Sequence, residues 1–164
     1  MSDYRRRADY AGKTIYVMLA LALIGIGVAF YDSYVIYNGQ QLWCPPPIDG
    51  CNTVAYSPYA RILGVPIGYL GLAYYLGMFG LAAWLAFEPF SRSLRWAVLL
   101  YTAAGPCASI YFFYVQRTYI QAFCVYCLIS GLVTVFLFIA ALRHFRATRA
   151  GGTRRPHEGA AIAT

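Results

Sequence analysis

The chain has 164 residues, of which 60% are hydrophobic and only 12% are charged. Soluble proteins have about 25% charged residues, and a soluble core cannot absorb so much apolar surface. The net charge of +7 would suit a nucleic-acid-binding protein, but the basic residues lie at the two ends of the chain and beside apolar runs. Composition therefore excludes both classes and indicates an all-α integral membrane protein.

Four apolar segments follow one another along the chain. Each is long enough to cross about 30 Å of hydrocarbon as a helix that rises about 1.5 Å per residue. The first is too long for a signal peptide and lacks a small-x-small cleavage site, so we expect it to be retained. The expected segments are residues 14–34, 66–87, 94–115 and 122–142.

These segments predict a four-transmembrane-helix bundle as the single folded domain, at residues 14–142. A basic N-terminus, residues 1–13, precedes it. The polar and basic tail, residues 143–164, is expected to be disordered because it has too little apolar surface to bury.

The distribution of Lys and Arg predicts the orientation, because cytoplasmic loops carry an excess of both. The N-terminus holds four of them, the link between the second and third segments two, and the tail five. The other two links hold only Arg61 and Arg117. We therefore expect a multi-pass protein of the cell membrane with both termini in the cytoplasm.

This orientation places four of the five cysteines outside the cytoplasm. Cys44 and Cys51 lie in the long first outer loop, and Cys124 and Cys127 form a C-x-x-C at the outer end of the fourth segment. Thiols at i and i+3 share one face of a helix, close enough to form a disulfide or bind a metal. Cys107, beside a proline in the third segment, is expected to be a packing residue only.

The first outer loop has two notable parts. Between Cys44 and Cys51, three prolines favour an extended chain and an Asp-Gly pair favours a turn that brings the cysteines together. Their disulfide would be either a structural staple or a redox centre. Residues 52–63 are expected to form a short interfacial half-helix over the mouth of the bundle. Ser57 would be its N-cap, or a hydroxyl donor to a nearby thiolate or quinone oxygen.

The fourth helix has its own start signal. Thr118-Tyr119-Ile120-Gln121 matches a capping box, so Thr118 is expected to cap this helix. Cys124 and Cys127 would then lie in its second and third turns, where the helix dipole favours a thiolate modestly.

Several chemistries are open to these cysteines. A zinc site is disfavoured, because six residues separate the first pair instead of the usual two to four. Hydrolysis needs an imidazole base, and both His144 and His157 are expected on the cytoplasmic side. Thiol–disulfide exchange needs only a thiolate, access and a resolving partner. Electrons would then enter at the outer pair and leave from the membrane pair to a lipid-soluble quinone.

A quinone carbonyl would also need hydrogen-bond donors, and a buried tyrosine hydroxyl needs a partner. The candidate tyrosines lie in the outer halves or the middles of the segments: Tyr74, Tyr111 and Tyr114.

Taken together, these residues resemble the vitamin K epoxide reductase family, in its bacterial form without a fused thioredoxin domain. The resemblance covers roughly residues 14–142. It rests on the outer-loop cysteine pair, Ser57, the Gly64-Val65-Pro66 entry to the second segment, and residues 122–128 around the C-x-x-C.

The resemblance implies a four-helix bundle around a quinone of menaquinone, ubiquinone or phylloquinone type, covered by a half-helix. It implies that Cys44 and Cys51 shuttle electrons, with Cys51 forming a mixed disulfide with Cys124. Cys127 would be the thiolate that meets the quinone, and Ser57 would assist. Because the chain ends in a basic tail, we expect a separate thioredoxin-fold protein as the partner on the outer side.

The chain departs from the vertebrate members of this family at two places. It has no asparagine in the second segment, and Gly131 stands where those enzymes have a tyrosine after the C-x-x-C. These departures disfavour vitamin K quinone or epoxide reduction proper, which is kept as an alternative activity. DsbB-type oxidases carry their C-x-x-C in the first outer loop, so they match less well. A non-enzymatic membrane scaffold or metal-binding protein with a static disulfide is the alternative from another class.

Overall fold

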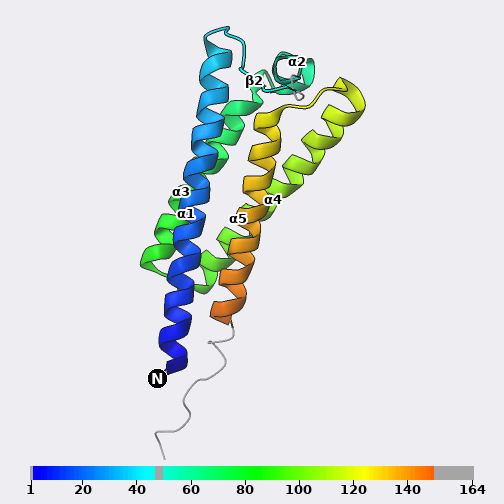
Figure 1. Cartoon of the computed structure of the whole chain (residues 1–164). Helices are drawn as coiled ribbons and strands as arrows, with labels where there is room; N and C mark the ends of the chain where they lie inside the picture. The colour runs from blue at the N-terminus through cyan, green and yellow to red at the C-terminus, as the bar shows by residue number, and fades with distance from the viewer. Residues whose placement is uncertain (1, 47–49, 150–164) are drawn as a thin grey trace, which may run out of the picture.

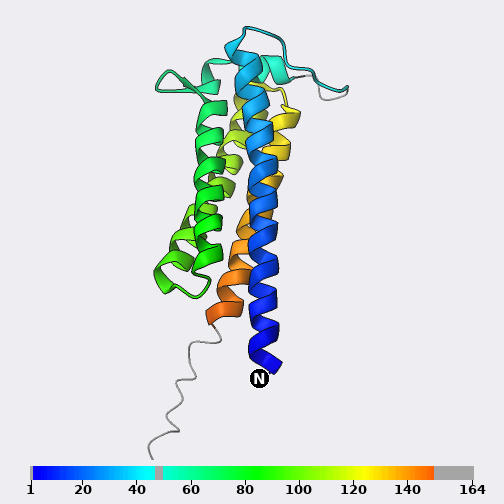
Figure 2. The same ribbon diagram turned by 90° about the vertical axis from the view of Figure 1, so that its left-hand side faces the viewer.

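The computed structural model describes residues 2–46 and 50–149. Four long helices run up and down as one elongated bundle (Figures 1 and 2), and each is long and apolar enough to cross a membrane. The predicted four-helix integral membrane fold is therefore confirmed. The helices are α1 (Ser2–Tyr37), α3 (Ile67–Phe87), α4 (Arg92–Val115) and α5 (Val125–Arg149).

Helix α1 packs along both α3 and α5, and α5 also packs against α4. The main core lies between these helices and includes Met18, Tyr75, Met78 and Leu137, all at most 1% exposed. Large apolar side chains also remain on the outside of the bundle, as expected where lipid instead of water surrounds the helices.

Both ends of the described chain lie at one end of the bundle, together with the link between α3 and α4 (Figure 1). The two other connections, from α1 to α3 and from α4 to α5, lie at the opposite end. We call this opposite end, which carries residues 38–46, 50–66 and 116–124, the loop end.

Two helices extend beyond their predicted bounds. Helix α1 begins at Ser2 instead of residue 14, and α5 continues to Arg149, so residues 143–149 are helical and not disordered. His144 explains the extension, because its Nδ1 lies 3.1 Å from Thr14 Oγ1 and ties the end of α5 to α1. The remainder of the predicted tail, residues 150–164, lies outside the described residues.

The half-helix over the bundle is split into two short pieces, α2 (Cys51–Ala55) and the 3₁₀ turn η1 (Pro58–Ala60). Ser57 directly precedes η1, as its predicted N-cap position requires. Its hydroxyl does not cap η1, however, and donates a hydrogen bond of 2.8 Å back to the Val54 carbonyl. Ser57 therefore joins the two pieces instead of starting one.

A small β-hairpin, absent from the sequence-based expectations, connects η1 to α3. Strand β1 (Arg61–Ile62) pairs antiparallel with β2 (Val65–Pro66). Leu63 and Gly64 form the turn, with φ angles of 51° and 81°. Two consecutive positive φ values are typical of two-residue hairpin turns, and glycine supplies one of them without strain.

The predicted start of the last helix is wrong. Thr118 lies inside a π-helical turn, η2 (Gln116–Ile120), which continues α4. The chain reverses after it through Gln121, whose φ of 56° is left-handed, and α5 begins at Val125. Cys124 and Cys127 therefore lie at the first turn of α5 and not in its second and third turns.

Candidate redox site

The first cysteine pair forms a disulfide at the loop end of the bundle. The Cα atoms of Cys44 and Cys51 lie 6.2 Å apart, a usual separation for this bond. Cys51 is the first residue of α2 and is completely buried, whereas Cys44 is only half-buried. The two sulfurs of one bond therefore differ in access: one is reachable from the loop side and the other is enclosed.

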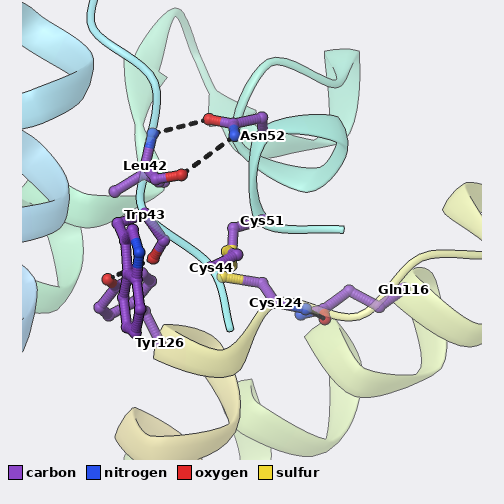
Figure 3. Close-up of a disulfide and its surroundings, with 8 residues drawn as sticks. All are labelled: Leu42, Trp43, Cys44, Cys51, Asn52, Gln116, Cys124 and Tyr126. Atoms are coloured by element: carbon purple, nitrogen blue, oxygen red, sulfur yellow. Dashed lines mark hydrogen bonds between the residues drawn. A yellow bond between two sulfur atoms is a disulfide. The ribbon is translucent and has the colours of Figure 1, made fainter. Parts of the chain in front are cut away.

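Two sets of hydrogen bonds hold this disulfide in place (Figure 3). The Asn52 side chain pairs with the backbone of Leu42, accepting from its N–H at 2.8 Å and donating to its carbonyl at 3.1 Å. The Tyr126 hydroxyl donates to the Trp43 carbonyl at 2.7 Å. Because Tyr126 belongs to the C-x-x-C, this second bond links the two cysteine pairs directly.

Gly50 lets the disulfide loop approach the C-x-x-C segment closely. A Cβ atom at this position would lie 2.8 Å from Ala122 Cβ and 2.9 Å from the Phe123 carbonyl oxygen. Only a residue without a side chain fits this gap. Gly50, the glycine of the predicted Asp-Gly turn, thus lies against Ala122 and Phe123, the two residues that directly precede Cys124.

Cys124 faces the disulfide from the segment that enters α5. Its side chain points toward Cys44 and Cys51 in Figure 3, and it shares one buried cluster with Cys51. Its backbone N–H donates to Gln116 Oε1 at 3.0 Å, and its carbonyl accepts from Leu128 N–H at 3.1 Å. Cys124 is thereby fixed at the end of α5, and it is only 2% exposed.

The electrostatics of Cys124 favour a thiolate. A hydrogen bond from the Cys127 thiol lowers the pKa of Cys124, and burial only partly opposes this effect. The position at the start of α5 acts in the same direction, because the helix dipole favours negative charge there. Among the two free thiols of the pair, Cys124 is thus prepared as a nucleophile or a leaving group beside the disulfide.

Below the cysteines, a cavity of about 790 Å³ opens between the helices. Its volume is in the range of sites that hold small molecules and cofactors. Cys124 and Cys127 reach it from one side and Ser57 from the cover formed by α2 and η1. Tyr74 lines it from α3, and Gly131 lines it from α5.

The lining is mostly apolar, with a few hydroxyl groups that converge on it. The Tyr75 hydroxyl lies 2.8 Å from Ser130 Oγ, and Ser109 Oγ lies 3.1 Å from Thr134 Oγ1. These groups come from α3, α4 and α5. An apolar space with a small number of polar groups is the usual character of a ligand cavity.

Not every residue predicted for the site reaches it. Tyr111 and Tyr114 are 58% and 56% exposed and do not line the cavity. The cavity face of α4 follows the helical repeat through Gly105, Ser109 and Gln116, and the two tyrosines fall between these positions. Cys107 is exposed on the outside of α4, so it is not a core packing residue as predicted.

Four residues of the site escaped the sequence-based predictions: Asp32, Asn52, Gln116 and Tyr126. For Asp32 the sequence did contain a signal, because it is a lone carboxylate within the apolar first segment. For Asn52, Gln116 and Tyr126 the sequence contained no such signal, because their contacts depend on which separate segments of the chain meet. Within the described residues, no group of three or more His, Cys, Asp or Glu side chains is placed to hold a metal ion.

The fold and the site define a class: a membrane-spanning four-helix protein with two adjoining cysteine pairs above an apolar cavity. Residues 16–142 match the Vitamin K epoxide reductase family, and the chain belongs to this family. The resemblance identified from the cysteine pattern is therefore confirmed.

Among curated proteins, the chain is similar to the thiol-disulfide oxidoreductase LTO1 of Arabidopsis thaliana, with 32% identity over 119 residues. The match covers 69% of this chain and 32% of that protein, so the chain spans about a third of the relative's length.

Proposed function

We propose that this protein is a quinone-linked thiol–disulfide oxidoreductase that drives disulfide formation outside the cytoplasm. A separate thioredoxin-fold protein would deliver electrons to Cys44 and Cys51, which pass them to Cys124 and Cys127 and on to a membrane quinone. One observation carries the proposal: Cys124 lies between the Cys44–Cys51 disulfide and the cavity, and contacts both.

The difference in burial within the first pair supports the order of the steps. A thiolate of the partner would attack half-buried Cys44 and release the Cys51 thiolate. The partner's second thiolate then attacks the partner's own sulfur in this mixed disulfide, which breaks the bond to Cys44. The partner leaves with its own disulfide, and Cys44 and Cys51 are both reduced. Cys51, enclosed beside Cys124, is placed for the next exchange and is shielded from other disulfides.

In that exchange the Cys51 thiolate attacks Cys124 of an oxidised Cys124–Cys127 pair. The S–S bond of this pair breaks, a Cys51–Cys124 bond forms, and Cys127 leaves as the thiolate. Attack of Cys44 on Cys51 then restores the first disulfide and leaves two reduced thiols at the cavity. The structure has this arrangement, with Cys44–Cys51 bonded and Cys124 and Cys127 free.

The cavity fits a quinone ring on several counts. It is apolar, it lies between membrane-spanning helices, and the Cys127 side chain lines it. The Tyr74 hydroxyl would hold a ring oxygen from α3, with Ser57 at the outer end. A bound quinone would supply a two-electron acceptor. Gly131 leaves open the space that a tyrosine side chain would fill at this position in the vertebrate enzymes.

The charge distribution supports the orientation. The basic side chains are concentrated at the end of the bundle that holds both chain ends, and this end is proposed to be cytoplasmic. Of the described residues, only Arg61 and Arg117 carry a basic side chain at the loop end. The cysteine pairs would then face the oxidising side, where disulfides form and persist.

The test measures quinone reduction by the purified protein in detergent, with dithiothreitol as the dithiol and a short-chain ubiquinone as the acceptor. Absorbance of the quinone reports turnover. We expect the Cys127→Ser variant to lose activity at least a hundredfold, because no disulfide can form at the cavity. The matched control is Cys107→Ser, which removes an exposed thiol outside the site. Normal turnover of Cys127→Ser would contradict the proposal.

A further inference from the structure

Helix α1 contributes a carboxyl group to the cavity. Asp32 is half-buried and lies on the same helical face as Val28 and Ile36, four residues to either side, which also line the cavity. Of the described residues that line it, Asp32 is the one with a formal charge at neutral pH. An ionisable side chain in a membrane-spanning helix is costly to place, and such residues commonly have a function.

The surroundings of Asp32 leave space for its carboxyl group and place its charge within electrostatic reach of the redox thiols. On α3 the facing residue is Gly68, where a Cβ atom would lie 2.7 Å from Asp32 Oδ2, so this glycine makes room for the carboxyl group. The titratable groups that interact with its charge are Cys124, Tyr126 and Cys127. Among the described residues, no Lys, Arg or His forms an ion pair with Asp32.

The proposed reaction needs a group of this kind. When Cys124 and Cys127 form their S–S bond, they lose two electrons and two protons, and a quinone takes up two of each to become a quinol. The other polar side chains of the described lining are hydroxyls and the Gln116 amide, which are not bases at neutral pH. His144 lies at the other end of the bundle, against Thr14.

We propose that Asp32 is the proton-transfer residue of the cavity: its carboxylate accepts a proton from the Cys124–Cys127 thiol pair and passes it to the nearer quinone oxygen. The other thiol proton is released to water, and a proton from water completes the second oxygen. Two electrons and two protons are thereby conserved. This inference rests on the proposed quinone-linked function.

Replacing Asp32 with Asn should have two effects of opposite sign. Although the Cys127 hydrogen bond lowers the pKa of Cys124, the Asp32 charge raises it. Loss of this charge should therefore increase the thiolate fraction at a given pH and speed alkylation of Cys124. Loss of the proton carrier should at the same time slow quinone reduction, because general acid–base groups contribute about 10²–10⁴-fold.

The experiment compares the wild type with Asp32→Asn, Asp32→Glu and Asp9→Asn, which removes an exposed carboxylate at the far end of the same helix. Three rates are measured: alkylation of the reduced thiols by iodoacetamide against pH without quinone, exchange with dithiothreitol, and single-turnover reduction of a short-chain ubiquinone.

For Asp32→Asn we expect alkylation shifted to lower pH, thiol exchange within about threefold of the wild type, and quinone reduction slower by about a hundredfold. Asp32→Glu should recover part of the rate, and Asp9→Asn should match the wild type.

Quinone reduction by Asp32→Asn at the wild-type rate would overturn the inference. So would a parallel loss of exchange and quinone reduction with no alkylation shift, which indicates a structural role. Failure of the wild type itself to reduce quinone would instead overturn the proposed function.

Discussion

Cys124 shows how much a single residue depends on its immediate neighbours. Its backbone is held by the Gln116 amide, and its thiol accepts a hydrogen bond from Cys127. The first contact fixes its position beside the disulfide and the second favours its ionised form. Thiol–disulfide exchange proceeds through the thiolate, so both contacts bear on the proposed relay.

The hydrogen bond from Cys127 can be tested through the pH dependence of Cys124. Since the bond lowers the pKa of Cys124, its removal in Cys127→Ala should raise that pKa. The alkylation rate of Cys124 should then rise with pH over a higher range than in Cys127→Ser, whose hydroxyl still donates. The measurement uses iodoacetamide in a Cys107→Ser background with the Cys44–Cys51 disulfide intact. Coincident curves for the two variants would refute this account of the pKa.

At this scale the sequence predicts residues that the structure brings together at the site, but not the residues that support them. The four cysteines and Ser57 could be identified because their spacing is specific. Gln116 and Asn52 could not, because their amides act through contacts with residues eight and ten positions away. Tyr111 and Tyr114 were chosen for their depth in the predicted segment, but depth does not determine which face of α4 a side chain occupies.

Among the elements, the contact between the disulfide loop and the start of α5 governs the meeting of the two cysteine pairs. Gly50 allows it, since its backbone lies against Ala122 and Phe123 without an intervening side chain. The Tyr126 hydroxyl reinforces it from the opposite direction, through the Trp43 carbonyl.

Substitution Gly50→Ala should therefore separate the two pairs. The added methyl would lie 2.8 Å from Ala122 Cβ and 2.9 Å from the Phe123 oxygen, so one backbone must move. We expect electron transfer from Cys44–Cys51 to Cys124–Cys127 to slow about tenfold or more, measured by rapid quenching and alkylation mass spectrometry.

Reduction of the first disulfide by dithiothreitol should change little in this variant. Gly27→Ala is the matched control, because a Cβ at that position in α1 meets nothing within 4 Å. An unchanged transfer rate in Gly50→Ala would show that the close approach is not required.

The elements also show where sequence patterns mislead. The four membrane spans were predicted because their apolar length is unambiguous. The capping box at Thr118 failed because η2 continues α4 by π-helical geometry, and Gln116 supplies the acceptor for Cys124 N–H in place of a local cap. The hairpin of β1 and β2 is too short, at two residues in each strand, to leave an alternating pattern.

Over the whole molecule, a buried polar contact between α1 and α5 lies at the opposite end from the cysteine pairs. The end that holds both chain ends is tied by Thr14 and His144, and His144 is only 2% exposed. The Thr14 hydroxyl lies 2.8 Å from the Ala11 carbonyl oxygen and 3.1 Å from His144 Nδ1, so it joins the start of α1 to the end of α5. The two cysteine pairs, by contrast, lie together at the loop end.

Replacing Thr14 with Val should destabilise the bundle without changing its chemistry. The buried His144 would lose the Thr14 hydroxyl as a partner at Nδ1, and leaving a buried polar group unsatisfied costs about 1–3 kcal/mol. We expect a lower free energy of unfolding in an SDS titration and an unchanged rate of quinone reduction below the unfolding transition. Tyr16→Phe, at a side chain 74% exposed on the same helix, is the control. An altered redox rate in folded Thr14→Val would show that the two ends are coupled.

The unequal burial of Cys44 and Cys51 has a consequence for the cell. Small thiols such as glutathione would meet only the half-buried sulfur of Cys44, while Cys51 and Cys124 exchange in an enclosed space. In the proposed relay, the exchange step at Cys44 then separates the membrane quinone from the thiols of the surroundings. Electrons would enter the relay only from a dithiol that reacts at Cys44 and completes a two-electron exchange. The other sulfurs lie under the cover formed by α2 and η1.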